Sequence, residues 1–233
     1  MKTVLFDLDG TLLHVDIEAF LKEYLQAISN YCRSLAEPQV FTQRLLESTH
    51  RMVQNDGSRT NEEVFMQSFL PAIGKRKEEV YPVLENFYTQ EFPLLERYVK
   101  RADEARLVAE EVLSRGWQII LATNPLFPRK AIMERMRWAG IDQLPWLHVT
   151  SYENSKSSKP SLLYYQQILQ GHGLHPEDCW MIGNDTGEDL VASQLGLKTY
   201  LVTDYLIERE NASFVPQGRG SLSDLLEFVR KEL

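Results

Sequence analysis

The sequence predicts an α/β fold in which a parallel sheet is flanked by helices and carries an inserted all-helical domain. Three observations support this. In the second half of the chain, short runs that are apolar throughout alternate with helical patterns, as in βαβ units. The residues between 15 and 97 keep helical periodicity without an intervening strand. Polar residues cluster where the predicted strands stop, which is where parallel sheets bind ligands.

The predicted strands are short apolar runs bounded by turn residues, at 4–6, 118–122, 146–149, 179–182 and 199–202. From residue 101 onward they alternate with predicted helices at 101–115, 128–139, 160–170, 187–195 and 222–232. Pro128 and Pro160 suit the first turns of their helices, and Ser221 can cap the last helix. These elements predict a parallel sheet covered on both sides.

The inserted helical domain is expected to span 15–97, and the sheet domain to comprise 1–14 and 98–233. In the first helix of the insertion, apolar residues recur with the spacing of one helix face: Ile17, Phe20, Leu21, Tyr24, Leu25, Ile28, Tyr31 and Leu35. Further helices are expected from Pro38, from Thr60 and over 76–90: Thr60 and Glu63 match a capping box, and Pro82 should lie near the start of the last helix or kink it.

Composition and charge exclude several classes of partner. The chain has 233 residues, of which 43% are hydrophobic, enough to bury a sizeable core. Its formal net charge of −8 favours neither nucleic acid nor a membrane surface as a partner. Cys32 and Cys179 are too few and too far apart for a disulfide framework, and the sequence shows neither a targeting segment nor a membrane-spanning run. We therefore expect a cytoplasmic protein.

Four carboxylates are predicted to converge at one edge of the sheet. Asp7 and Asp9 follow the first strand, and side chains two apart in extended backbone point to the same side. Two carboxylates that close repel each other unless a cation or a shared proton relieves them. Asp185 and Asp189 follow the strand at 179–182 and add two more. Such a set of oxygen ligands predicts a hard divalent cation, for which Mg²⁺ is the usual choice.

A hydroxyl and a cation are expected beside these carboxylates. Thr123 follows the second predicted strand, and Lys159 precedes the helix that leads toward Asp185. A positive charge with a hydroxyl donor suits an anion with several oxygens, such as phosphate. Lys156 is an alternative for the lysine, but Lys159 is preferred because Pro160 follows it. Taken singly, these residues have structural explanations as helix caps or surface charges; together they favour a site.

Taken together, these motifs resemble those of the haloacid dehalogenase-like hydrolases. The stretch 7–12 (DLDGTL) looks like the family's first motif and Thr123 in LATN like the second. Lys159 before Pro160 looks like the third, and 183–189 like the acidic fourth, in the family order. The resemblance covers the whole chain and points to the phosphatase branch, similar to phosphoglycolate phosphatases and β-phosphoglucomutases. It implies a Rossmann-like core with the helical insertion as a cap domain.

The resemblance also implies roles for individual residues. Asp7 would be the nucleophile that forms an aspartyl-phosphate, and Asp9 the general acid that later acts as base. Lys159 would neutralise charge on the nucleophile and the phosphoryl group. Thr123 and the backbone amide of Asn124 would bind the phosphoryl oxygens. These assignments imply a phosphoric monoester hydrolase.

For the metal, the resemblance implies Mg²⁺ held by Asp7, Asp9 through its backbone carbonyl, and Asp185. Asp189 would bind the metal directly or through water. Asn184 departs from the family pattern because it stands between Gly183 and Asp185, where relatives often run Gly directly into Asp.

The second carboxylate also bears on the chemistry. Family members that displace halide lack a carboxylate at the position of Asp9 and need no metal, so its presence favours phosphate chemistry. Pro125 departs from the family pattern because it offers no backbone N–H to a phosphate. Arg51 and Arg59, in the helical insertion, are expected to be solvated helix-end charges in preference to substrate ligands.

The resulting hypothesis is a Mg²⁺-dependent phosphohydrolase acting on a small phosphorylated metabolite, a small-molecule phosphate ester, under a mobile cap. One alternative is a phosphomutase, which shares every motif and returns the phosphoryl group to a sugar phosphate. A second alternative is a non-catalytic protein that binds a phosphorylated ligand. Retention of the nucleophile, acid and cation positions counts against this last possibility.

Overall fold

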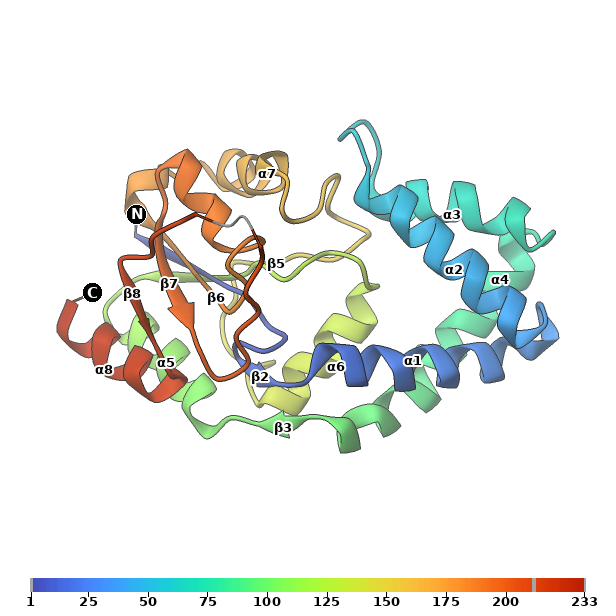
Figure 1. Ribbon diagram of the computed structural model, residues 1–233, viewed down its shortest axis with the longest axis horizontal. Coiled ribbons are helices and arrows are strands. Elements are labelled where there is room, and N and C mark those ends of the chain that lie inside the picture. The colour runs from blue at the N-terminus through green and yellow to red at the C-terminus, as the bar shows by residue number, and fades with distance from the viewer. Residues whose placement is uncertain (1, 211–212, 233) are drawn as a thin grey trace.

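The computed structural model describes residues 2–210 and 213–232, and its centre is a six-stranded parallel sheet (Figure 1). The strands are β5 (His148–Val149), β4 (Gln118–Leu121), β1 (Thr3–Phe6), β6 (Cys179–Gly183), β7 (Lys198–Val202) and β8 (Gly218–Gly220), in that spatial order. In the central register, Phe6 lies beside Leu121 on one neighbour and Ile182 on the other. The carboxyl ends of β1, β4 and β6 therefore meet at one edge.

Helices cover both faces of this sheet. Alternate residues of β1 enter different cores: Val4 and Phe6 pack on one side and Leu5 on the other. The first face is covered by α5 (Asp103–Ser114), α6 (Arg129–Ala139) and α8 (Leu222–Glu232). The second is covered by α7 (Leu162–His172) and the 3₁₀ helix Leu190–Leu195. The predicted α/β fold is confirmed, and a strand buried on both faces explains its uninterrupted apolar sequence.

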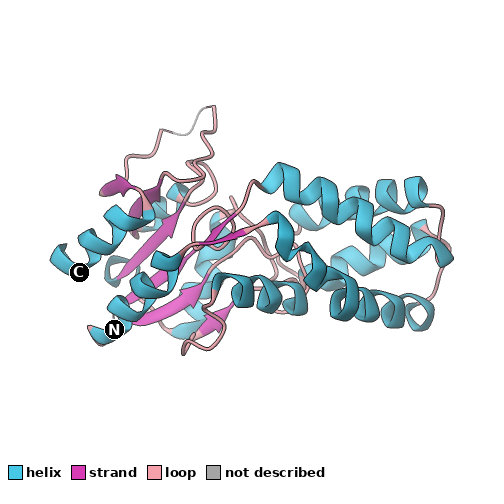
Figure 2. Ribbon diagram, turned by 90° about the horizontal axis from the view of Figure 1, so that it is seen from below, coloured by secondary structure: helices cyan, strands magenta, loops and turns pink. Residues whose placement is uncertain are grey.

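A bundle of helices lies beyond the carboxyl edge of the sheet (Figures 1 and 2). It contains α1 (Ile17–Tyr31), α2 (Pro38–Val53), α3 (Asn61–Ala72) and α4 (Lys77–Asn86). The π-helical turn Phe87–Glu91 and the 3₁₀ helix Phe92–Tyr98 return the chain to the sheet. Aromatic contact joins the two parts, because Phe92 stacks on Trp138 of α6 with ring centroids 5.3 Å apart. One apolar core thus runs from the sheet into the bundle.

The chain enters and leaves the bundle through a pair of short antiparallel strands. β2 (Leu13–His14) precedes α1, and β3 (Lys100–Arg101) follows the bundle. Leu13 pairs with Arg101 and His14 with Lys100. The entry and exit points of the helical segment therefore lie side by side.

Most predicted elements are confirmed, with local corrections. The capping box at Thr60 and Glu63 is present, and Ser221 accepts a hydrogen bond from the amide of Asp224 at the start of α8. Pro82 lies inside α4. The predicted helix at 160–170 begins later, because Ser161 caps α7 and Pro160 lies before that cap.

Other corrections concern strand and helix type. The stretch 187–195 forms only a 3₁₀ helix from Leu190, and the strand at 146–149 is limited to His148–Val149. Strand β8 was not predicted, because Gly218-Arg219-Gly220 contains no β-branched or aromatic residue.

Candidate active site

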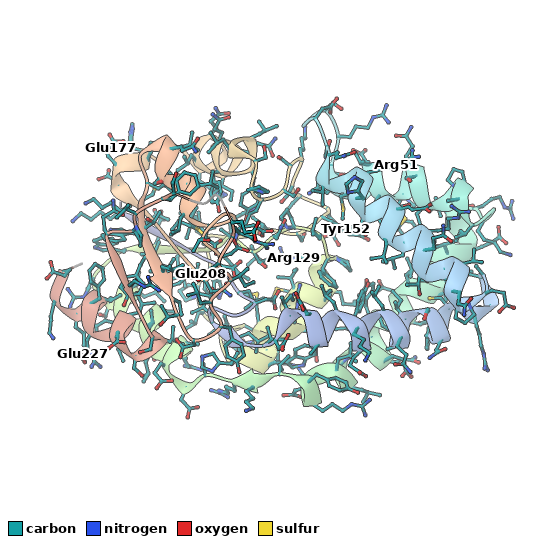
Figure 3. The ribbon with its side chains drawn as sticks, in the orientation of Figure 1. Arg51, Arg129, Tyr152, Glu177, Glu208 and Glu227 are labelled. Carbon is teal, nitrogen blue, oxygen red and sulfur yellow. The ribbon has the colours of Figure 1, made fainter. Side chains whose placement is uncertain are left out.

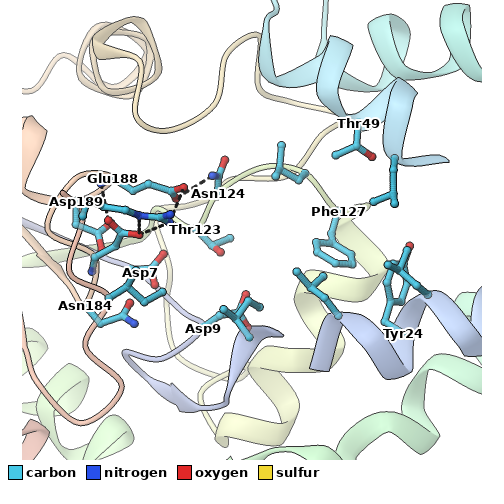
Figure 4. A pocket seen from close by; sticks show the side chains of 18 of the residues that line it. Asp7, Asp9, Tyr24, Thr49, Thr123, Asn124, Phe127, Asn184, Glu188 and Asp189 are labelled. Carbon is cyan, nitrogen blue, oxygen red and sulfur yellow. Dashed lines mark hydrogen bonds and ion pairs between the residues drawn. The ribbon is translucent and has the colours of Figure 1, made fainter. Parts of the chain in front are cut away.

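The predicted polar residues meet in a cavity between the sheet and the helical bundle (Figure 4). Its volume is about 350 Å³. The sheet side is lined by residues that follow the three central strands: Asp7, Asp9, Thr123, Asn124, Asn184, Asp185, Glu188 and Asp189. Parallel strands bring these segments together although they are far apart in the sequence.

Two carboxylates share one buried ammonium group. The Lys159 Nζ donates to Oδ1 of Asp7 at 2.8 Å and to Oδ1 of Asp189 at 2.6 Å. Burial alone would lower the pKa of Lys159, but Asp189 and Asp7 raise it well above its ordinary value. Burial raises the pKa of Asp189 to about 6, and the charge of Lys159 opposes that shift. The structure thus brings Lys159 to Asp7, whereas Lys156 is exposed.

Close packing of the loops requires two glycines. Gly10 has a φ of +81°, and a Cβ there would collide with the side chain of Asn184. A Cβ at Gly183 would collide with Asp189, whose Oδ2 accepts a hydrogen bond from the amide of Asp185 at 3.0 Å. Both oxygens of Asp189 are therefore engaged within the protein, one by Lys159 and one by backbone.

Asp7 is also contacted on its second oxygen. The Thr11 hydroxyl lies 3.2 Å from Oδ2 of Asp7 and 3.1 Å from Oδ1 of Asn184, and it can donate its hydrogen to one of them at a time. Burial raises the pKa of Asp7, and Lys159 opposes that shift. Asp7 is thus fixed in orientation on the cavity wall.

Asp9 forms an ion pair with Arg135 of α6, which the sequence analysis missed. The Arg135 Nη1 donates to Oδ2 of Asp9, and the guanidinium lies 4.4 Å from the ring centroid of Phe127. Oδ1 of Asp9 is buried without a hydrogen-bond partner. Arg135 lies on the buried face of α6 one turn after Ala131. A lone arginine on an otherwise apolar helix face was the available sequence signal.

Asp185 forms a second ion pair that the sequence analysis missed. Arg209 donates to Oδ2 of Asp185 from Nε at 2.8 Å and from Nη2 at 2.6 Å. The other oxygen accepts from the amides of Gly187 and Glu188, at 2.8 and 2.9 Å. The Arg209 segment is held in place because Ile207 exchanges backbone hydrogen bonds with Asn184 and Thr186 on either side of Asp185.

Thr123 and Asn124 complete the sheet side of the cavity. The backbone carbonyl of Thr123 accepts from the hydroxyls of Thr150 and Tyr164, at 2.7 and 2.9 Å, which fixes the end of β4. The Asn124 side chain donates to Glu188 at 2.9 Å, and its Oδ1 is buried without a partner. Burial raises the pKa of Glu188.

The donor types here suit a hard cation, but their present arrangement does not. Asp7, Asp185 and Glu188 line one cavity and carry the oxygen ligands that Mg²⁺ prefers. However, Arg209 occupies the Asp185 oxygen that faces it. Within 2–210 and 213–232, no three His, Cys, Asp or Glu side chains form a group that could hold a metal ion. A divalent cation could use Oδ2 of Asp185 only if Arg209 left it.

The predicted cap arginines lie away from the cavity. Arg51 is exposed in the last turn of α2 (Figure 3). Arg59 is exposed in the loop that follows. Neither is among the residues that line the cavity. The loop after β4 is instead tied to the bundle by Asn61, whose Nδ2 donates to the carbonyl of Pro125 at 3.2 Å.

The chain belongs to the haloacid dehalogenase-like hydrolase family, whose model matches residues 1–205. A comparison with curated proteins gave no match. No helix in the described part of the chain is long and apolar enough to cross a membrane. The two cysteines are free and buried.

Solved structures share the fold over almost the whole chain. A HAD phosphatase from Thermococcus onnurineus matches with a TM-score of 0.61 and 17% identity, over 98% of each chain. An L-2-haloacid dehalogenase from Xanthobacter autotrophicus matches with a TM-score of 0.60 and 16% identity over 100% of each chain. A putative beta-phosphoglucomutase from Thermotoga maritima gives 0.60 and 18% over 100% of each chain. At these identities the likeness concerns the fold.

Proposed function

We propose that the protein is a phosphoric monoester hydrolase that uses Asp7 as its nucleophile. The supporting observation is that Asp7 and Asp9 line one cavity, with Lys159 on the first carboxylate and Arg135 on the second. An oxygen of Asp7 attacks phosphorus and the bond from phosphorus to the ester oxygen breaks. Asp9 gives its proton to the leaving oxygen. The product of this step is an aspartyl-phosphate.

In the second step Asp9 takes a proton from water, and the water oxygen attacks the same phosphorus. The bond between phosphorus and Asp7 breaks, which releases inorganic phosphate and restores the carboxylate. Lys159 offsets negative charge on Asp7, and the hydroxyl of Thr123 donates to a phosphoryl oxygen. The backbone amide of Asn124 is the further phosphate ligand in this scheme. Phosphoryl transfer depends mainly on such positioning and charge stabilisation.

The proposed cofactor is Mg²⁺, held by Asp7, Asp185 and the backbone carbonyl of Asp9. When bound, it would neutralise charge on the phosphoryl group. Arg209 would first have to leave Asp185, and its side chain is 53% exposed, so it has room to do so. In this scheme Asp189 reaches the metal through water, while its two oxygens contact Lys159 and backbone. Its role in this scheme is to orient Lys159.

The helical segment 15–97 is proposed as a cap domain on a core formed by 1–14 and 98–233. It forms one side of the cavity through α1 and α2, so its closure would exclude water from the reacting groups. The substrate in this scheme is a small-molecule phosphate ester in the cytoplasm.

The hydrolase is preferred to its alternatives on two grounds. Displacement of halide needs no acid at position 9, whereas Asp9 lies on the cavity wall. The nucleophile, cation and hydroxyl positions are all filled, which counts against a protein that only binds phosphate. A phosphomutase would use the same residues, and it would be recognised by isomer formation that depends on a bisphosphate activator.

Turnover of p-nitrophenyl phosphate tests the proposal. We expect wild-type activity that EDTA abolishes and Mg²⁺ restores, and a loss of roughly a thousandfold or more in Asp7→Asn because the nucleophile is removed. Asp103→Asn makes the same change at an exposed helix start and should behave as wild type. Undiminished activity in Asp7→Asn would refute the nucleophile.

A further inference from the structure

The cavity has two chemically different sides. The sheet side carries the carboxylates, the hydroxyl and the amide described above. The opposite side is formed largely by apolar side chains from α1, α2 and the loop after β4: Leu21, Leu25, Leu45, Leu46, Leu126 and Phe127. A phosphoryl group placed at Asp7 would therefore direct the rest of its ester toward an apolar surface (Figure 4).

The polar side chains on the cap side already have partners. The Tyr24 and Tyr88 hydroxyls lie 2.8 Å apart and share a hydrogen bond. Thr49 donates its hydroxyl hydrogen to the carbonyl of Leu45 at 2.9 Å. The cap side of the cavity also lacks a charged side chain among the described lining residues. The Tyr24–Tyr88 pair and Thr49 keep only the hydroxyl capacity that these hydrogen bonds leave over, so most hydroxyls of a polyol, or a second carboxylate, would lose their hydrogen bonds to water here without a matching replacement.

One leucine of this apolar side is also partly exposed to solvent. Leu46 lines the cavity and yet is 49% exposed. Its neighbour Leu45 is buried in the core of the bundle, so the apolar surface continues from the core to the opening. Leu46 also borders a separate groove beside Pro38 and Thr42, so an apolar group in the cavity would cover the part of Leu46 that lines it and remove that part from water, which is favourable.

We infer that the substrate is a phosphate monoester whose organic group is apolar, an alkyl or aryl chain, and not a sugar or another polyol. This inference rests on the proposed function and names the substrate class of the same site. The core residues hold the phosphoryl group, and the cap side selects the organic group by burying its carbon surface. Each added methylene should then raise kcat/KM by about fourfold until the cavity is filled.

A pair of substrates with the same carbon number tests this directly. Hexyl phosphate and sorbitol 6-phosphate both carry six carbons, but the second adds five hydroxyls. We expect kcat/KM to favour hexyl phosphate on the order of a hundredfold, because unsatisfied hydroxyls oppose burial. Equal or greater turnover of sorbitol 6-phosphate would overturn the apolar inference and leave the phosphatase proposal intact.

Two matched variants test whether Leu46 contributes to the preference for an apolar organic group. Leu46→Asn should lower kcat/KM for hexyl phosphate several-fold more than for methyl phosphate, because the longer chain has more carbon surface to bury against position 46. Leu107→Asn makes the same change on α5, where Leu107 is 48% exposed and does not line the cavity. It should alter neither substrate. Equal effects of the two variants would refute the role of Leu46.

Binding of phosphonates tests the apolar side of the cavity independently of phosphate hydrolysis. Calorimetry should show tighter binding of hexylphosphonate than of methylphosphonate to the wild type, without any turnover being needed. If hexylphosphonate is preferred but hexyl phosphate is not hydrolysed, the apolar site stands and the proposed function fails. If the two phosphonates bind equally, the apolar site is refuted whatever the activity.

Discussion

Arg209 places two hydrogen bonds on a single carboxylate oxygen of Asp185, from Nε at 2.8 Å and from Nη2 at 2.6 Å. The second oxygen of Asp185 is held by two backbone amides. A guanidinium and a divalent cation cannot both occupy the same oxygen, so the two compete. The chain therefore carries its own cation at the place where the proposed Mg²⁺ would bind.

Removal of this arginine should tighten Mg²⁺ binding. Arg209→Gln frees Oδ2 of Asp185, and we expect the dissociation constant for Mg²⁺, measured by calorimetry, to fall about tenfold. Arg219→Gln removes the same charge from an exposed position on β8 and should leave the constant unchanged. If both variants bind Mg²⁺ as the wild type does, competition at Asp185 is excluded.

Lys159 should contribute strongly to stability as well as to chemistry. In Lys159→Met the carboxylates of Asp7 and Asp189 lose the ammonium that they share in a buried setting. We expect the free energy of unfolding in urea at neutral pH to fall by about 3–5 kcal/mol. Lys156→Met, three residues earlier and exposed, is the control and should be neutral. A fall of less than about 1 kcal/mol in this free energy of unfolding would show that the ion pairs of Lys159 with Asp7 and Asp189 are exposed to solvent.

Asp189 should make stability depend on pH. Its pKa is raised from 3.8 to about 6 in the folded protein, mainly by burial. A carboxyl group with a raised folded pKa stabilises the fold below its ordinary pKa, and this contribution is lost as the pH rises through about 6. Relative to Asp189→Asn, the wild type should thus lose about 2 kcal/mol of unfolding free energy between pH 4 and 7.

Urea unfolding at several pH values measures this difference, with Asp103→Asn as the exposed control. Parallel pH curves for the wild type and Asp189→Asn would show that Asp189 keeps an ordinary pKa in the folded protein. The control should run parallel to the wild type throughout.

Arg135 should act by positioning Asp9. The guanidinium contacts Asp9 and packs on Phe127, and it does not line the cavity itself. We expect Arg135→Met to lower kcat for p-nitrophenyl phosphate about tenfold to a hundredfold with little change in KM, because the acid is misplaced while the phosphate ligands remain. Arg135→Lys should recover part of this loss.

An exposed arginine on the same helix provides the control. Arg137→Met removes an exposed side chain whose ion pair is with Glu134 of the same helix, and kcat should not change. A rise in KM with unchanged kcat in Arg135→Met would assign Arg135 to substrate binding instead.

The sheet and its polar edge could be predicted because both depend on local pattern. Strands buried on both faces have uninterrupted apolar sequences, and Asp7, Thr123 and Asp185 each follow such a run within three residues. The topology that brings them together follows from parallel pairing. Strand β8 could not be predicted, because its two glycines have a low strand propensity. It is a strand because it pairs with β7.

The two arginine partners depend on tertiary contacts. Arg135 reaches Asp9 from a helix that packs beside β2, and Arg209 reaches Asp185 from a loop fixed by backbone pairing at Ile207. Neither pairing has a local sequence pattern. The contact of Asp189 with Lys159 could not be predicted either, because it depends on tertiary packing.

The pairing of β2 with β3 gives the helical segment adjoining ends. Because its two ends lie side by side, the helical insertion attaches to the rest of the chain as a hairpin loop would, whatever its length or content. Its helices can consequently change in evolution without shifting the spacing of the strands that carry the carboxylates.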